Sequence, residues 1–341
     1  MLLEGLQLPL TTPFYADGRL NLRKMEQNVA AYSKSPAAGL AVLTEYGEAT
    51  MLSDEETLGV LEAAIGAAAP EKTMLAGISR GSVAATLALA GRAAGLGSDA
   101  ALVSPPPFLE AGRERLQKEL LIYFQAIADR SPIPLVIAGA VPEEIVKELA
   151  QNPGIIGVVR SDVDSGSIAQ LRQSTASVTH EVTVTQIFAA VTARMLARQR
   201  TTLSAEMLAG GAAVAVAPAG TALKTRTKTV GFQILAGSTM GMLEGLLAGA
   251  VGAMPAFAAC APQACYEVYA AWKDGDRGLA EEKQARLNAV AQKVEAELGV
   301  AAVKFGCDFN GYAGGNPRLP LLPLSADERQ QVEGLMQGLR N

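Results

Sequence analysis

Histidine is almost absent from this chain of 341 residues, which contains only His180. Its scarcity argues against a Ser-His-Asp triad and against a multi-histidine metal site within one chain. The three cysteines form no disulfide framework and fit a reducing compartment. A basic surface is also lacking, because the net charge is −5, and this argues against a nucleic-acid partner. Any chemistry here must therefore proceed almost without imidazole.

Long hydrophobic runs are also missing, although 49% of the residues are hydrophobic. The longest weakly charged segment, 246–266, consists largely of Ala and Gly and is interrupted by Pro255 and Pro262. A membrane-spanning helix needs about 20 strongly apolar residues. Residues 1–14 lack the basic start of a signal peptide. We therefore expect a cytoplasmic protein with an alanine-rich core and no membrane partner.

Short apolar segments alternate with amphipathic segments along most of the chain. This alternation predicts a parallel sheet covered by helices on both faces, which is either a closed barrel or an open doubly wound sheet. The glycine-rich motifs of nucleotide-binding sheets, GxGxxG and GxxxxGK[ST], are absent. Capping boxes at Ser53-Glu56 and Ser325-Glu328 predict two helix starts. The expected strands are 6–12, 40–43, 73–76, 100–103, 133–137, 155–159, 232–235 and 252–254.

The alternation stops after residue 159, and the following segment resembles an insertion. It contains an alternating Val-Thr-Val piece at 182–184, a predicted helix Ile187–Gln199 and an excess of basic residues. We interpret it as a structural appendage or an oligomer contact, with a ligand-binding lid as the alternative. The expected organisation is a barrel over 1–175, an insertion over 176–229, the rest of the barrel over 230–260 and a helical domain over 261–341.

Five segments, in chain order, resemble the family of class I aldolases that includes dihydrodipicolinate synthase and N-acetylneuraminate lyase. The resemblance covers nearly the whole chain outside the insertion. It implies a (β/α)8 TIM barrel with a C-terminal helical extension, assembled as a homo-oligomer (dimer or tetramer). The segments are Pro-Leu-Thr-Thr-Pro-Phe at 9–14, Gly-Glu at 47–48 with Leu-Ser-Asp-Glu-Glu at 52–56, Ile-Ile-Gly-Val-Val at 155–159, Phe-Gln-Ile-Leu-Ala-Gly at 232–237, and Arg-Leu-Pro-Leu-Leu-Pro-Leu-Ser at 318–325.

The resemblance implies Schiff-base chemistry, in which a lysine at the end of strand six reacts with a 2-oxo acid, usually pyruvate. A tyrosine of strand five transfers protons, and a Gly-Thr-Thr-Gly-Glu loop binds the carboxylate. This chain departs at each position. Val159 stands at the lysine position and Ala138 at the tyrosine position, while Glu45 and Tyr46 replace the threonine pair. Arg160 cannot replace the lysine, because its guanidinium stays protonated.

Other lysines offer poor substitutes for the missing amine. Lys72 precedes a strand and is therefore expected at the amino end of the barrel, away from catalytic loops. Lys304 matches a lysine of the C-terminal helices and is interpreted as a solvated or structural charge. Lys224 and Lys228 lie in the insertion and reach the mouth only if the insertion folds over it.

The loop after the second strand holds the most reactive remaining side chains, because βα loops face the mouth of such a barrel. Glu45 and Tyr46 are the candidate catalytic residues, as base and proton donor; alternatively Glu45 is a solvated charge. Glu48 either contributes to the pocket or binds backbone N–H groups of its own loop. The candidate pocket residues are Thr11, Thr12, Thr44, Gly47, Glu48, Ala138, Val159 and Ser238.

Two functional hypotheses follow, and neither requires a cofactor. In the first, the mouth binds a small oxo acid or sugar acid without Schiff-base aldolase activity. In the second, the chain is an active lyase, aldolase or hydratase that uses Glu45 and Tyr46 as an acid–base pair. A hard-cation site formed by Glu45, Glu48 and Asp162 has no motif to support it, so we expect no metal.

Overall fold

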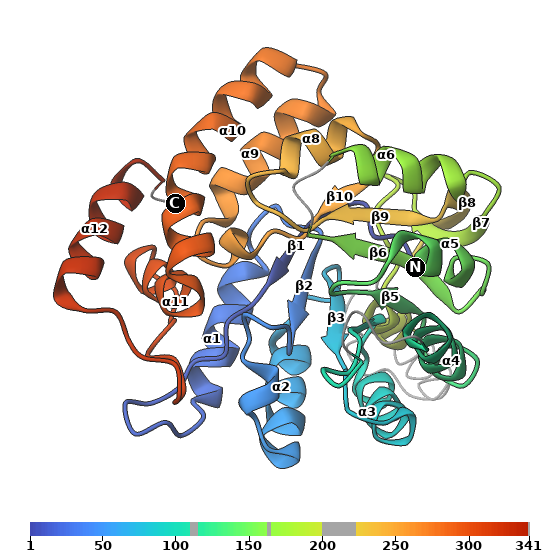
Figure 1. Cartoon of the computed structure of the whole chain (residues 1–341), viewed down its shortest axis with the longest axis horizontal. Coiled ribbons are helices and arrows are strands. Elements are labelled where there is room, and N and C mark those ends of the chain that lie inside the picture. The colour runs from blue at the N-terminus through green and yellow to red at the C-terminus, as the bar shows by residue number, and fades with distance from the viewer. Residues whose placement is uncertain (110–114, 162–164, 200–222, 340–341) are drawn as a thin grey trace, which may run out of the picture.

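The computed structural model describes residues 1–109, 115–161, 165–199 and 223–339. Eight parallel strands close into a barrel in the order β1-β10-β9-β6-β5-β4-β3-β2 (Figure 1). Closure confirms the predicted (β/α)8 barrel and excludes the open sheet. The barrel strands are β1 (Gly5–Pro9), β2 (Gly39–Val42), β3 (Thr73–Gly77), β4 (Ala100–Val103), β5 (Leu135–Ile137), β6 (Ile155–Arg160), β9 (Gln233–Ala236) and β10 (Gly252–Ala253).

The strands are buried on both faces, which explains why the sequence shows apolar runs where a half-exposed strand would alternate. Leu75, Val136, Val159 and Leu235 belong to a cluster of apolar side chains separate from the one that includes the helices. Their neighbours in sequence, such as Val158, pack with the surrounding helices. Strand alternation therefore places Val159 inside the barrel.

The helices that follow the strands cover the barrel on the outside (Figure 1). Ser53 and Glu56 form the predicted capping box at the start of α2. The helices between the strands are α1 (Leu22–Tyr32), α2 (Asp54–Ala67), α3 (Val83–Leu96), α4 (Leu116–Ala128), α5 (Glu143–Leu149), α6 (Ser165–Ser174) and α8 (Met242–Leu247).

The insertion contributes an antiparallel two-stranded sheet, formed by β7 (Thr179–Thr185) and β8 (Thr225–Gly231), and a helical segment over residues 193–199. The predicted helix Ile187–Gln199 is wrong in its first half. Phe188 has a φ of 63° and the chain turns there, and the backbone N–H of Ala189 donates to the hydroxyl oxygen of Thr185 at 3.1 Å. The helix therefore begins only after the buried Thr192.

The described part of the insertion lies at the amino end of the barrel. The backbone N–H of Ala193 donates to Asp99, which precedes β4, at 2.7 Å. Lys228 pairs with Glu4, which precedes β1, at 3.0 Å. These described residues therefore do not form a lid over the opposite, carboxyl end.

The C-terminal domain is a group of helices beside the barrel, coloured orange to red in Figure 1. Its last helix begins at the predicted capping box of Ser325 and Glu328. Within the described ranges, no helix combines the length and apolar character that crossing a membrane requires. The domain contains α9 (Pro262–Lys273), α10 (Arg277–Ala291), a π-helical turn labelled η3 (Gln292–Glu297), α11 (Gly299–Phe309) and α12 (Ala326–Met336).

Candidate active site

The loop after β2 is held in an unusual backbone conformation. Leu43 and Glu48, which flank it, have φ values of 59° and 54°. Non-glycine residues adopt this left-handed region at a cost of about 1–3 kcal/mol each, and only where the surroundings enforce it. Gly47 sits tightly inside the loop, because a Cβ there would lie 3.0 Å from the Leu10 carbonyl oxygen. The Thr44 side chain supports the turn by accepting from the Gly47 N–H at 3.3 Å.

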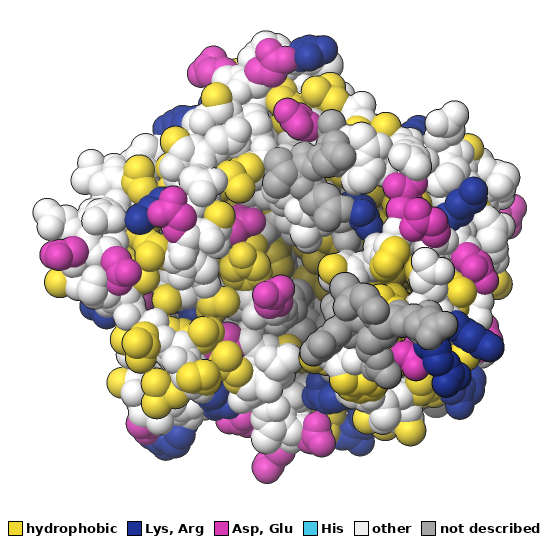
Figure 2. Space-filling model, viewed as in Figure 1, with side chains coloured by type: hydrophobic (Ala, Val, Ile, Leu, Met, Phe, Trp, Pro, Cys, Tyr) yellow, Lys and Arg dark blue, Asp and Glu magenta, His cyan; other side chains and the backbone are white. Residues whose placement is uncertain are grey.

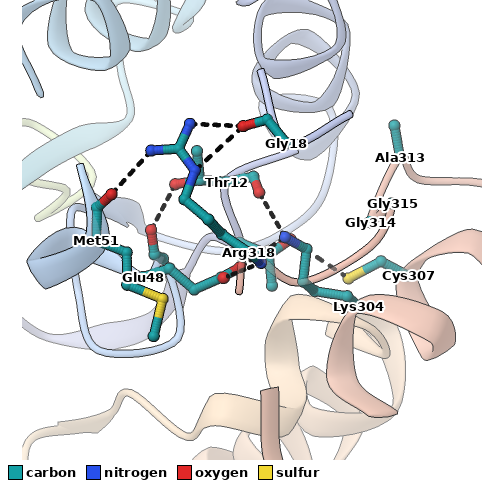
Figure 3. A network of polar contacts seen from close by, with 12 residues as sticks. Thr12, Gly18, Glu48, Met51, Lys304, Cys307, Ala313, Gly314, Gly315 and Arg318 are labelled. Atoms are coloured by element: carbon teal, nitrogen blue, oxygen red, sulfur yellow. Dashed lines mark hydrogen bonds and ion pairs between the residues drawn. The ribbon is translucent and has the colours of Figure 1, made fainter. Parts of the chain in front are cut away.

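Glu48 points away from solvent into an ion pair with the C-terminal domain (Figure 3). Its Oε1 lies 2.6 Å from Nζ of Lys304, and the two side chains are 1% and 0% exposed. Its Oε2 accepts the backbone N–H of Arg318 at 2.7 Å. Burial lowers the pKa of Lys304, and the Glu48 charge opposes that shift. Lys304 is thus a buried structural charge, one of the two roles expected for it and not the solvated one.

Lys304 and Arg318 share one aromatic partner at this junction. The ammonium of Lys304 lies 4.4 Å from the Phe14 ring centroid, and the guanidinium of Arg318 lies 4.3 Å from it. Arg318 also binds both carboxylate oxygens of Glu56 at 2.7 Å. This bidentate pair lowers the pKa of Glu56 to about 2. An ion pair therefore connects the first turn of α2 to the segment that precedes α12.

The two threonines after β1 are both buried. The hydroxyl of Thr12 donates to the Gly47 carbonyl oxygen at 2.6 Å, and its own carbonyl oxygen accepts from Nζ of Lys304 at 2.8 Å. Thr11 contacts Sγ of Cys307 at 3.8 Å. Thr12 therefore holds the β2 loop in place.

Glu45 and Tyr46 occupy the outer part of the same loop. Glu45 is exposed, while Tyr46 is partly buried and packs against the hydrophobic core. Burial raises the pKa of Tyr46, and the charges of Glu295 and Glu45 raise it further. Tyr46 therefore remains a protonated phenol at neutral pH and can donate a hydrogen bond.

Glu295, on η3 of the C-terminal domain, lies at the candidate site and is absent from the residues expected there from the sequence. Its Oε2 accepts the hydroxyl of Thr239 and, at 3.1 Å, the backbone N–H of Phe257. Thr239 follows β9 and Phe257 follows β10, so Glu295 lies at the carboxyl end of these strands. Nothing in the sequence marked it, because it lies in a charged helical segment with no motif. Nearby Ser238 is buried, and its hydroxyl accepts the Gly241 N–H at 3.2 Å.

Val159 lies at the carboxyl end of β6 and is 4% exposed. Its neighbour on β9 is Leu235. A Cβ at Gly237 would lie 2.8 Å from Cγ1 of Val159, so glycine leaves the space that the branched side chain fills. Ala138 follows β5, is partly buried, and donates its backbone N–H to the Val103 carbonyl oxygen at 2.8 Å.

The middle of the barrel is hollowed on its carboxyl side. Figure 2, drawn from the same side as Figure 1, shows a hollow over the middle of the barrel, with hydrophobic side chains around it and an acidic side chain beside it. Across the described ranges, no three His, Cys, Asp or Glu side chains are grouped to hold a metal ion. Asp162, considered above as a cation ligand, lies outside the described residues.

Comparison with known proteins places this barrel in a family. A model of the dihydrodipicolinate synthetase family matches residues 2–196 and 211–339. The chain belongs to the dihydrodipicolinate synthetase family. It is 27% identical to 4-hydroxy-tetrahydrodipicolinate synthase of Acidiphilium cryptum, over 98% of each chain. It is 28% identical to L-threo-3-deoxy-hexylosonate aldolase of Hypocrea jecorina, over 98% of this chain and 95% of that one.

A solved structure supports the same fold assignment. Dihydrodipicolinate synthase from Bacillus anthracis superposes with a TM-score of 0.78 at 18% identity, and the match covers 100% of each chain. In this dihydrodipicolinate synthetase family member, two of the alternative lysines lie away from the mouth. Lys72 donates to the carbonyl oxygens of Ser35 and Ala37, both at 2.7 Å, before β2. Lys228 lies on β8, at the amino end.

Proposed function

We propose that this family member binds a small oxo acid or sugar acid at the barrel mouth without forming a Schiff base. The observation that carries the proposal is the inward-facing Val159 at the carboxyl end of β6. The family resemblance assigns a nucleophilic lysine to this position, and valine has no nucleophile. Ala138, at the position that the resemblance assigns to the catalytic tyrosine, has no proton to donate.

The neighbouring cations support this proposal because none of them offers a free amine. Arg160 donates through Nη1 to the Val141 carbonyl oxygen at 2.9 Å, and a guanidinium does not deprotonate at working pH. The amine of Lys304 is enclosed by Glu48, the Thr12 carbonyl oxygen and the Phe14 ring. A carbonyl carbon could reach that amine only by displacing a buried ion pair.

Borohydride trapping tests the proposal. The protein is incubated with pyruvate and sodium borohydride and examined by mass spectrometry, with a lysine-containing dihydrodipicolinate synthase treated in parallel as the positive control. We expect the control to gain a reduced pyruvyl adduct and this chain to gain none, while calorimetry detects non-covalent binding of pyruvate or gluconate. A covalent adduct on any lysine of this chain would overturn the proposal.

A second candidate function is acid–base catalysis by a lyase, aldolase or hydratase acting on an oxo acid or sugar acid. The observation that favours it is the protonated phenol of Tyr46 beside the exposed carboxylate of Glu45. The carboxylate would take a proton from carbon and the phenol would donate one to oxygen. If screening of such acids reveals an activity, Glu45→Gln with Tyr46→Phe should abolish it, whereas Glu55→Gln, an exposed carboxyl of α2, should not. Activity unchanged in the double variant would refute this role.

We further propose that the protein is cytoplasmic and forms a homo-oligomer, a dimer or tetramer, with no nucleic-acid or membrane partner. The family resemblance and the alanine-rich helices support the assembly, and the acidic net charge of −5 supports the lack of a nucleic-acid partner. Light scattering at micromolar concentration should give a dimeric or tetrameric mass. A monomeric mass across that range would contradict the assembly.

A further inference from the structure

The first strand of the insertion, β7, ends in a tight turn that presents two large apolar side chains to solvent. Ile187 is 86% exposed and Phe188 is 51% exposed. Thr185 closes the turn, because its backbone N–H donates to the Ala189 carbonyl oxygen at 2.9 Å and its carbonyl oxygen accepts the Phe188 N–H at 3.0 Å. We call Ile187 and Phe188 the tip. Its two side chains are thus held outward on a well-tied turn.

The backbone of the tip is strained at Phe188. Its φ of 63° lies in the left-handed region, which glycine and asparagine adopt more easily than an aromatic residue does. Residues in this conformation cluster where a protein makes functional contacts. The guanidinium of Arg226 lies 4.8 Å from the centroid of the Phe188 ring, yet half of the side chain stays exposed. Packing within the chain therefore does not explain an aromatic residue here.

A cavity of about 390 Å³ lies beside the insertion at the amino end of the barrel. It is enclosed by α2, the end of α3 and the helical segment over residues 193–199. Thr192, which follows the turn of the tip, donates its hydroxyl to the carbonyl oxygen of Pro70, a lining residue. The tip and the cavity therefore belong to one end of the molecule. The apolar part of the lining comes from Ile65, Ala68, Pro70, Leu96 and Ala197.

The charged residues of this cavity suit the tip and its arginine. Glu62, an exposed carboxylate of α2, lines the cavity and is a partner of opposite charge for Arg226. Arg198, also exposed, can stack its guanidinium on an aromatic ring that enters the cavity. The third charged lining residue, Arg194, already pairs with Asp99 at 3.5 Å. An aromatic side chain accompanied by an arginine therefore fits this cavity in shape and in charge.

The exposed tip does not fill the cavity of its own chain, so we propose that two copies of the chain associate through this end, with the tip of each copy inserted into the cavity of the other. Every copy carries both parts, so the contact is reciprocal and forms a closed twofold dimer. It removes the exposed apolar surface of both tips from water. This inference rests on the homo-oligomer proposed above and specifies the surface that forms it.

The first test changes the tip. Phe188→Asn removes the ring, while asparagine tolerates the left-handed backbone of the turn. We expect an unchanged circular dichroism spectrum and a dimer dissociation constant raised at least about tenfold, because the contact loses its central aromatic residue. Light scattering at micromolar concentration should then give half of the wild-type mass. Leu279→Asn, at a 41% exposed apolar residue of α10, is the matched control and should keep the wild-type mass.

The second test fills the cavity. A Cβ at Gly66, on α2, meets no atom within 4 Å, so Gly66→Leu fits the free chain but occupies space that the tip needs. This variant should also have half of the wild-type mass, whereas Gly91→Leu, at an equally open helical glycine of α3 outside the cavity, should not. A mixture of Phe188→Asn and Gly66→Leu restores one of the two contacts. Native mass spectrometry should therefore detect more mixed dimer than dimer of either variant.

Wild-type mass in a folded Phe188→Asn or Gly66→Leu variant would overturn the inference and leave the proposed homo-oligomer intact, since another surface would then hold the copies together. If circular dichroism shows that one variant does not fold, the other variant decides. A monomeric wild-type protein would overturn both the inference and the proposed assembly.

Discussion

Charged side chains connect both ends of the barrel to segments outside it, but the partners of these side chains differ between the two ends. At the amino end, Asp99 accepts the N–H groups of Met74 and Ala193 at 2.8 and 2.7 Å and pairs with Arg194 at 3.5 Å. Both of its oxygens are used within the fold. At the carboxyl end, Glu48 is used just as fully, and Glu295 accepts hydrogen bonds from Thr239 and Phe257. The amino end is thus held by residues of the insertion, and the carboxyl end by residues of the C-terminal helices.

This difference follows the general arrangement of such barrels, in which loops at the carboxyl end carry function and the amino end carries stability. Arg194 of the insertion donates to the carbonyl oxygens of Gly97 and Lys72, near the end of α3 and before β3. Free carbonyl groups near helix ends are natural partners for a cation. The insertion therefore contributes to closing the end of the barrel that has no catalytic loops.

The largest expected effect is at the carboxyl end. Lys304→Met should lower the free energy of unfolding by about 3–5 kcal/mol, because it leaves the Glu48 carboxylate buried without its partner. Urea unfolding followed by circular dichroism measures this loss. Lys273→Met, at a half-exposed ion pair with Glu4, is the control and should cost less than about 1 kcal/mol. Equal losses of unfolding free energy in the two variants would contradict a larger stabilising contribution from the buried Glu48–Lys304 ion pair.

At the amino end, Asp99→Ala should cost about 3 kcal/mol, because two backbone N–H groups and Arg194 lose their acceptor. Hydrogen exchange over residues 193–199 should increase, while pyruvate affinity should stay unchanged, since this joint lies opposite the mouth. Glu71→Gln, an exposed carboxyl beside the same junction, is the control. Loss of ligand binding in a folded Asp99→Ala variant would contradict the separation of the two ends.

The smallest expected effect concerns Glu56 and Arg318. The pKa of Glu56 falls from 4.5 to about 2 on folding, so the pair stabilises the fold above pH 4.5 and the stabilisation is lost as the pH falls toward 2. Because the pair is partly solvated, Glu56→Gln should cost about 1 kcal/mol at neutral pH. The difference in free energy of unfolding between wild type and Glu56→Gln, measured by urea unfolding, should become smaller at low pH. For Glu55→Gln, the difference in free energy of unfolding from wild type should not depend on pH. If the difference for Glu56→Gln were also independent of pH, the stabilising role of the Glu56–Arg318 pair would be refuted.

The fold could be predicted from the sequence because it depends on local patterns that repeat along the chain. Buried strands appear in the sequence as apolar runs. Each of the two capping boxes spans four residues and marks the start of a helix. The helix over 187–199 was wrong at its start because Phe188 adopts a left-handed backbone that helical periodicity does not reveal.

The candidate site could be predicted only in part, because its geometry depends on contacts between distant residues. The sequence predicts the β2 loop after its strand and offers a structural role for Glu48 as one of two alternatives. Its partners Lys304 and Arg318, however, lie more than 250 residues away, and no local pattern links them. Glu295 was missed for the same reason. The catalytic roles of Glu45 and Tyr46 stay predictions.

The distance along the chain between Glu48 and Lys304 has a consequence for synthesis. The two residues are 256 positions apart, so the first loops of the barrel are made long before the lysine that neutralises Glu48. Until α11 leaves the ribosome, this carboxylate must remain hydrated, and the β2 loop has no counter-charge to fix it. The mouth is therefore among the last parts of the molecule to take its final shape during synthesis, although it is built from some of the first residues.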